Sequence, residues 1–120
     1  MIKKIISIFF NSITNNIFNF KGRANRQEYI IFYIVECMVF TPFLILGKNN
    51  MTPLLTTLLV ICILIHIFAH TSLVVRRLHD CNINGWWFFL NILFSPLMFI
   101  VFLFKKGVDK PNRYGESPKD

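Results

Sequence analysis

The chain has 120 residues, of which 54% are hydrophobic and 14 are phenylalanine, and its formal net charge is +7. A soluble domain of this size has too little interior to bury so much apolar surface, and the charged residues are grouped between long uncharged runs, so the sequence indicates a single all-α integral membrane domain. Because the basic residues flank apolar runs, we expect them to contact anionic phospholipids and orient the chain in the bilayer, and we expect no nucleic-acid partner.

Residues 1–22 are predicted to form an amphipathic helix that lies in the membrane interface. Apolar residues recur at helical spacing from Ile5 to Phe20, with asparagine and serine on the other side. The apolar stretch after Lys3 and Lys4 is too short for a signal peptide, and no small-residue cleavage site follows it. The alternative is a partly disordered N-terminus, because asparagine is a poor helix former.

Three apolar runs then predict three transmembrane helices over residues 23–107. The first run, about 30–46, has roughly the minimum length that crosses a bilayer. The second, about 54–75, is the strongest, with about 22 residues and no acidic, Lys or Arg residue. Thr52 and the proline after it predict the start of this helix, because the threonine oxygen can cap free N–H groups and proline is tolerated at the first position.

The third run, about 86–104, is long enough to span but is interrupted by Ser95 and Pro96. We predict a full span, because each half of a re-entrant hairpin would reach only the middle of the bilayer. A full span divides Lys and Arg into seven on one side (N-terminal segment five, second loop two) and six on the other (first loop one, tail five). A hairpin divides them twelve to one, so charge bias favours the hairpin. The polar tail, 108–120, follows.

Three segments carry a family resemblance. They are FKGRANRQEY (20–29), RRLHDCNINGWW (76–87) and NRYGESP (112–118). Their order and spacing resemble the small bacterial inner-membrane proteins grouped as domain of unknown function 805, over nearly the whole chain from Phe20. Ile30 departs from the aromatic residue expected there. The resemblance implies a multi-pass protein of the bacterial inner (cytoplasmic) membrane with unknown activity, and it supplies no catalytic residues.

Two spans separate the first segment from the second, so both lie on one side of the membrane, where four arginines can approach two carboxylates. Arginine suits phosphate oxygens, which suggests a head-group site. Interhelical ion pairs that fix topology are the favoured alternative, because basic residues beside a span are ordinary. The candidate lipid- or partner-binding residues are Arg23, Arg26, Glu28, Arg76, Arg77, His79, Asp80, Trp86, Trp87, Asn112, Arg113 and Tyr114.

A second group lies inside the apolar runs, where ionisable residues are costly and suggest function. Glu36 and His70 fall at similar depth on antiparallel helices, with His66 one turn deeper, which predicts a Glu36–His70 hydrogen bond. The functional interpretation is a proton- or metal-responsive pair. The favoured one is a neutral interhelical hydrogen bond, because two histidines and one carboxylate lack the ligand count of a closed metal site. We therefore predict no metal and no cofactor.

The cysteines Cys37, Cys62 and Cys81 have no metal-binding or disulfide spacing, and Cys81 is expected to be exposed in a polar loop. No nucleophile–base pair can be placed, so an enzyme is not expected. Two hypotheses follow. The first is a non-enzymatic module that binds anionic lipid head groups or a partner membrane protein. The alternative is a subunit of a homo-oligomeric transporter or channel that uses the intramembrane Glu and His residues.

Overall fold

The computed structural model describes residues 1–47 and 52–118, and no β-strand is found among them. The all-helical class is therefore confirmed for this part of the chain, and the last two residues of the predicted tail lie outside it. In chain order the elements are α1 (Ile2–Ile13), α2 (Arg26–Leu46), α3 (Pro53–Asp80), the short 3₁₀ turn η1 (Gly85–Trp87), α4 (Phe88–Leu93) and α5 (Ser95–Phe104).

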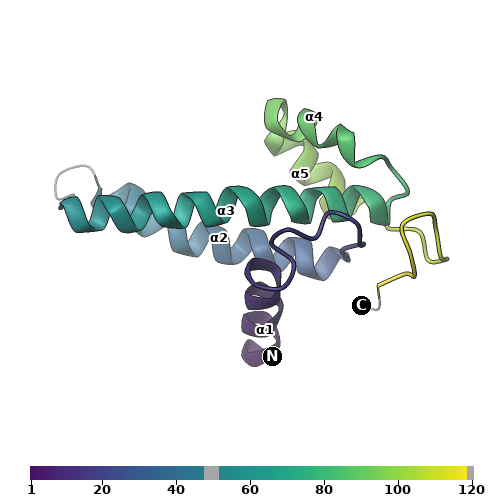
Figure 1. The fold of residues 1–120 in the computed structure, drawn as a ribbon, viewed down its shortest axis with the longest axis horizontal. Coiled ribbons are helices and arrows are strands. Elements are labelled where there is room, and N and C mark those ends of the chain that lie inside the picture. The colour runs from purple at the N-terminus through teal and green to yellow at the C-terminus, as the bar shows by residue number, and fades with distance from the viewer. Residues whose placement is uncertain (48–51, 119–120) are drawn as a thin grey trace.

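Helices α2 and α3 lie side by side and antiparallel along the longest axis of the molecule (Figure 1). The side chain of Asn25 caps α2 by accepting a hydrogen bond from the Glu28 amide at 2.8 Å. Thr52 caps α3 in the same way, with Leu55 as the donor, and Pro53 occupies the first turn. The predicted start of the second helix is confirmed, because α3 begins at Pro53 and Thr52 is its N-cap residue.

The two ends of this helical hairpin differ in their surroundings. From Pro53 to Phe68 the side chains of α3 are mostly exposed and apolar, whereas from Ala69 onward nearly all are buried. Within the described residues, α2 and α3 are the two helices long and apolar enough to cross a membrane. At 1.5 Å per residue they are about 31 and 42 Å long. We call the end where α3 terminates the packed end, because α1, α4, α5 and the tail gather there (Figure 1).

The predicted third span is wrong. The run divides into α4, with 6 residues, and α5, with 10, and these are about 9 and 15 Å long, too short to cross about 30 Å of hydrocarbon. Helix α4 ends at Leu93, because the φ of −126° and ψ of 36° at the next residue, Phe94, leave the helical region. Pro96 then stands in the first turn of α5, where its missing N–H is harmless. The chain instead turns back between α4 and α5, as in the alternative hairpin (Figure 1).

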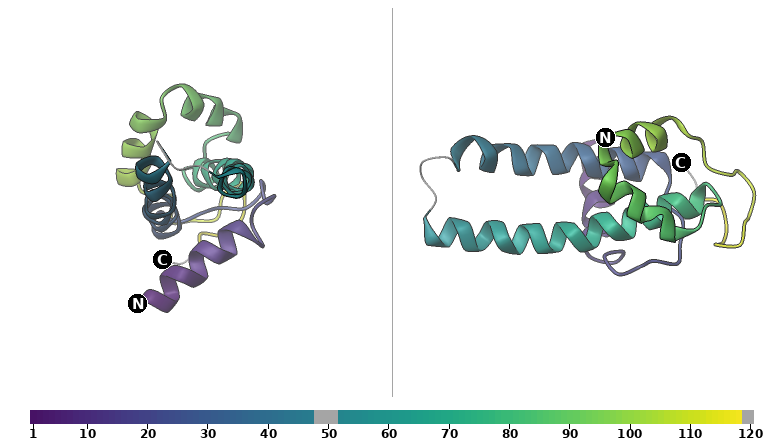
Figure 2. Two further views of the ribbon diagram at one scale, coloured as in Figure 1. Left: turned by 90° about the vertical axis from the view of Figure 1, so that its left-hand side faces the viewer. Right: turned by 90° about the horizontal axis from the view of Figure 1, so that it is seen from above.

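Helix α1 is shorter than predicted and ends at Ile13 instead of near residue 22. Three asparagines follow within the next six residues, and their side chains bond locally. One such bond joins Asn15 to Asn11 at 2.8 Å, and another joins Asn19 to Asn16 at 2.9 Å. Such bonds compete with helix propagation. Helix α1 crosses the hairpin steeply on one side, and α4 and α5 lie on the opposite side (Figure 2).

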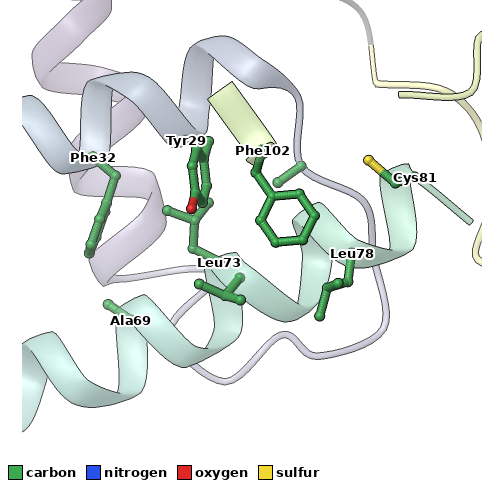
Figure 3. Close-up of a cluster of buried hydrophobic side chains, with 9 residues drawn as sticks. Tyr29, Phe32, Ala69, Leu73, Leu78, Cys81 and Phe102 are labelled. Atoms are coloured by element: carbon green, nitrogen blue, oxygen red, sulfur yellow. The ribbon is translucent and has the colours of Figure 1, made fainter. Parts of the chain in front are cut away.

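The core is confined to the packed end (Figure 3). Helices α2, α3 and α5 meet there around Tyr29, which is fully buried and lies edge-on to Phe102, with ring centroids 6.2 Å apart. The core therefore holds α5 against the hairpin, and with it the start of the tail. Its buried members are Ala24, Tyr29, Phe32, Ala69, Leu73, Val74, Leu78, Cys81 and Phe102.

Candidate functional site

The last turn of α3 carries a cluster of buried charges. Asp80 pairs with two arginines: its Oδ1 accepts from Arg23 Nε at 3.0 Å and Nη2 at 2.9 Å, and its Oδ2 accepts from Arg77 Nη1. The three side chains are at most 5% exposed. A single carboxylate thus compensates two buried guanidinium groups. Removing this carboxylate would leave both positive charges without their shared counter-ion in a poorly solvated site.

The same two arginines bind the C-terminal segment through its backbone. Each guanidinium also donates to carbonyl groups at the end of α5 or beyond it. Arg23 and Arg77 therefore fasten the tail to the end of α3. The accepting carbonyls for Arg23 are those of Val108, Lys110 at 3.0 Å and Gly115 at 3.2 Å, and for Arg77 those of Phe102 at 3.3 Å and Lys105.

Arg76 joins α3 to α2 and α1. Its Nη1 lies 2.8 Å from Glu28 Oε1, which also accepts a 2.9 Å hydrogen bond from the hydroxyl of Ser12. The Arg76 carbonyl accepts from the Ala24 amide at 3.0 Å. The Nε and Nη2 of Arg76 are buried and have no hydrogen-bond partner among the described residues. This arginine therefore fixes three elements while keeping donors unused.

His79 connects the second family-like segment to the third. Its ring stacks on Tyr114, with centroids 3.7 Å apart and an interplanar angle of 6°, and its Nδ1 donates to the Gly22 carbonyl at 3.2 Å. The side-chain amide of Asn112 donates through Nδ2 to the backbone carbonyl of His79 at 2.9 Å. Arg113 lies over the Tyr114 ring at 4.8 Å. All three segments therefore meet at the packed end.

The remaining predicted residues lie around this cluster. Trp86 and Trp87 are 74% and 57% exposed, and Arg26 lines a small polar pocket next to Asp80. Cys81 is buried, which corrects the expected exposure, because it packs as a member of the hydrophobic core (Figure 3). Burial raises the pKa of the Cys81 thiol above its usual value, so this thiol stays protonated at neutral pH.

The residues predicted to lie inside the membrane come together where the packed end meets the exposed half of the hairpin. The Glu36 carboxylate lies between the two histidines, 3.4 Å from His66 Nε2 and 3.7 Å from His70 Nδ1. The predicted Glu36–His70 hydrogen bond is not formed, because the separation exceeds hydrogen-bond length. His70 instead contacts the Tyr33 hydroxyl at 3.3 Å and the Asn91 amide at 3.2 Å through Nε2.

Comparison with known proteins places this chain in a family. The sequence profile described as protein of unknown function (DUF805) matches residues 17–116. The chain belongs to the DUF805 family. Inner membrane protein YhaI of Escherichia coli K12 is 34% identical over 119 residues, covering 92% of this chain and 95% of YhaI. Inner membrane protein YhaH of the same strain is 32% identical over 120 residues, covering 92% of this chain and 96% of YhaH. No solved structure matches significantly.

The DUF805 match covers the polar cluster and the group formed by Glu36, His66 and His70 but names no activity. The relatives agree with the sequence-based expectation of an inner-membrane protein, since both are inner membrane proteins by name. For this DUF805 chain, function must therefore be argued from the geometry of the packed end and of the hairpin.

Four residues with a part in these groups were not identified from the sequence. Ser12 and Tyr33 gave no signal, because one looked like the polar side of a helix and the other like part of an apolar run. Asn91 stood out only as an interruption of the third run. Gly107 looked like a helix stop, yet a Cβ added there would lie 1.9 Å from Asp80 Oδ2, so the backbone passes directly over the carboxylate.

Proposed function

We propose that this chain is a non-enzymatic membrane module that inserts α2 and α3 as a hairpin and binds anionic lipid head groups at its packed end. Two helices of sufficient length and apolarity support the insertion, as do the exposed apolar side chains on their distal halves. With the hairpin along the membrane normal, α1 runs along the membrane surface. That is the orientation expected of an interfacial amphipathic helix.

The observation that carries the proposal is the return of the chain between α4 and α5. This turn brings the basic tail to the end of α3, where the Arg23 and Arg77 side chains hold it. Basic residues of the hinge and of the tail thereby share one end of the molecule. By the positive-inside rule this end faces the cytoplasm. The solvent-accessible basic residues there are Lys21, Arg26, Lys105, Lys106, Lys110 and Arg113.

The three buried arginines have a different part in this proposal. Arg23, Arg76 and Arg77 are each at most 9% exposed and pair with Asp80 or Glu28, so they organise the packed end. Direct head-group contact belongs to the exposed lysines and to Arg26 and Arg113. An exposed basic residue near an anionic membrane surface contributes about 1 kcal/mol of attraction, which falls with ionic strength.

The test uses the chain's own tryptophans as reporters. The sequence has two, Trp86 and Trp87, and both are exposed at the packed end. The full chain is reconstituted in phosphatidylcholine bilayers that contain either brominated phosphatidylglycerol or brominated phosphatidylcholine, because bromine quenches tryptophan on contact. We expect stronger quenching by the anionic lipid at equal mole fraction, and we expect the excess to disappear as salt is raised.

Charge variants make this test specific. Lys105→Gln, Lys110→Gln and Arg113→Gln together should reduce the preference for phosphatidylglycerol several-fold, since each removes an exposed positive charge. Glu116→Gln, on the same tail, is the matched control and should raise the preference, because it removes a negative charge. Equal quenching by both lipids at low salt would contradict the proposal.

A further inference from the structure

Three side chains with ligand chemistry converge between α2 and α3, far from the polar cluster. Glu36 comes from α2, and His66 and His70 lie one turn apart on one face of α3. One nitrogen from each ring and a carboxylate oxygen all lie within 4.8 Å of one another. We propose that these residues bind a divalent transition-metal ion of the zinc class, a role that goes beyond the proposed lipid binding and does not depend on it.

The separations match coordination better than hydrogen bonding. Ligand atoms about 2.0–2.2 Å from a tetrahedral zinc ion lie about 3.3–3.6 Å from one another. Glu36 Oε1 lies 3.4 Å from His66 Nε2, and Glu36 Oε2 lies 3.7 Å from His70 Nδ1. The second distance is too long for a hydrogen bond. A metal ion between these atoms would bridge it with two short bonds.

Two of the facing atoms are otherwise unused. Glu36 Oε2 and His70 Nδ1 are buried and have no hydrogen-bond partner among the described residues. Leaving a buried polar atom without a hydrogen-bond partner destabilises the fold, and more so for a charged group. Both atoms belong to the pair separated by 3.7 Å, so one ion would satisfy both.

The far side of His70 is arranged as in metal sites. A ligating histidine is usually held through its other ring nitrogen, and His70 Nε2 contacts the Tyr33 hydroxyl at 3.3 Å and the Asn91 amide at 3.2 Å. Metal binding through Nδ1 places the ring proton on Nε2, where the Tyr33 oxygen accepts it. A half-turn of the Asn91 amide would present its buried Oδ1, which has no partner among the described residues, to the same proton.

The ligand count that argues against a closed structural site fits an open one. Zinc sites with three protein ligands keep a fourth position for water or another small ligand. Glu36 and His66 line a cavity of about 200 Å³ whose other walls are mostly apolar and include Phe9 and Ile13 of α1. This cavity provides room for the fourth ligand. Two imidazoles and one carboxylate suit zinc, and also cobalt, nickel and copper, by donor type.

The experiment uses Co²⁺ as a spectroscopic probe for the zinc-class site. The full chain, free of any histidine tag, is purified in a mild detergent, stripped with a chelator and titrated with Co²⁺ while visible absorption is recorded. We expect one Co²⁺ per chain with the strong ligand-field bands of four- or five-coordinate cobalt, displaced by Zn²⁺. Zn²⁺ should also raise the midpoint of thermal unfolding, because an ion that binds only the folded state stabilises it.

Substitutions locate the site. Glu36→Gln, which keeps the side-chain shape, and His66→Gln and His70→Gln should each weaken binding at least about 100-fold, and Tyr33→Phe about tenfold, as for loss of an outer-shell contact. His79→Gln and Glu116→Gln are the matched controls for imidazole and carboxylate, and should bind like the wild type. Unfolding midpoints measured without metal show that each variant is folded.

Two results would exclude the metal site. If the wild type binds no Co²⁺, the group is a neutral interhelical contact and the metal site is excluded. The same holds if folded Glu36→Gln and His66→Gln bind Co²⁺ as tightly as the wild type. If the chain shows no preference for anionic lipid but still binds Co²⁺, the proposed function fails and the metal site stands.

Discussion

At the scale of single residues, Asp80 is a position where we expect a substitution to be strongly destabilising. It is 4% exposed and its carboxylate compensates Arg23 and Arg77 together. Asp80→Asn keeps the shape but removes the charge, so two buried guanidinium groups lose their counter-ion. Removing one partner of a buried ion pair costs about 3–5 kcal/mol. We expect a loss of that order in the free energy of unfolding, measured by titration of the detergent-solubilised chain with sodium dodecyl sulfate.

Asp109 supplies the matched control for this substitution. It pairs with Lys106 at 2.8 Å, but both side chains are more than two-thirds exposed. Water and salt screen such a pair, so Asp109→Asn should leave the unfolding curve almost unchanged. Equal effects of Asp80→Asn and Asp109→Asn would mean that the buried cluster does not hold the packed end together.

The sequence could predict which of these residues share one side of the membrane, but not which atoms pair. Two intervening helices place the hinge and the second loop together whatever the orientation, and this brought Arg23 and Asp80 within reach in the sequence-based prediction. Which carbonyls the guanidinium donors reach depends on where the tail returns. The predicted full third span placed the tail on the other side of the membrane, so the bonds from Arg23 to Lys110 and Gly115 could not be foreseen.

At the scale of elements, the prediction that failed is the single spanning helix over the third apolar run. Its composition and total length satisfy the criterion for a span, and these were weighed above its internal signals. Phe94, Ser95 and Pro96 end one helix and begin another, and Asn91 turns inward to His70. A buried polar side chain and a helix-starting proline within one run mark a hairpin. The lopsided division of basic residues pointed the same way.

The exit from α5 provides an element-scale prediction. The Val108 amide donates to the Asp80 carbonyl at 2.9 Å, and Gly107 leaves no room for a side chain beside Asp80 Oδ2. Gly107→Ala should push the tail away from α3 and lower the free energy of unfolding by about 1–3 kcal/mol, the usual cost of overpacking. Faster proteolysis within the tail, followed by mass spectrometry, reports the release.

Gly22 is the matched glycine for this test. A Cβ added there would first meet the Asn19 side chain at 3.4 Å, an ordinary contact. Gly22→Ala should therefore leave both the proteolysis rate and the unfolding curve close to those of the wild type. If Gly107→Ala is cleaved no faster than Gly22→Ala, the tail is not docked against α3 in the membrane.

At the scale of the whole molecule, the distribution of packing predicts how the chain sits in a bilayer. The exposed apolar half of the hairpin is the part that suits hydrocarbon, and the charges, the tail and α1 gather at the opposite end (Figure 1). Both the hinge and the tail should then be accessible from one side of the membrane. The start of α3 should be accessible from the other side.

Single-cysteine labelling checks this topology. The native cysteines are replaced, because buried Cys81 with its raised pKa reacts too slowly to report a side. Exposed positions then receive one cysteine each: Lys21→Cys, Glu116→Cys and Thr52→Cys. An impermeant maleimide should label the first two from one side of the membrane and the third from the other, when intact cells are compared with inverted vesicles. Labelling of Glu116→Cys from the same side as Thr52→Cys would mean that the α4–α5 run crosses the bilayer. The tail could then not meet Asp80, and the basic packed end would not exist as a single surface.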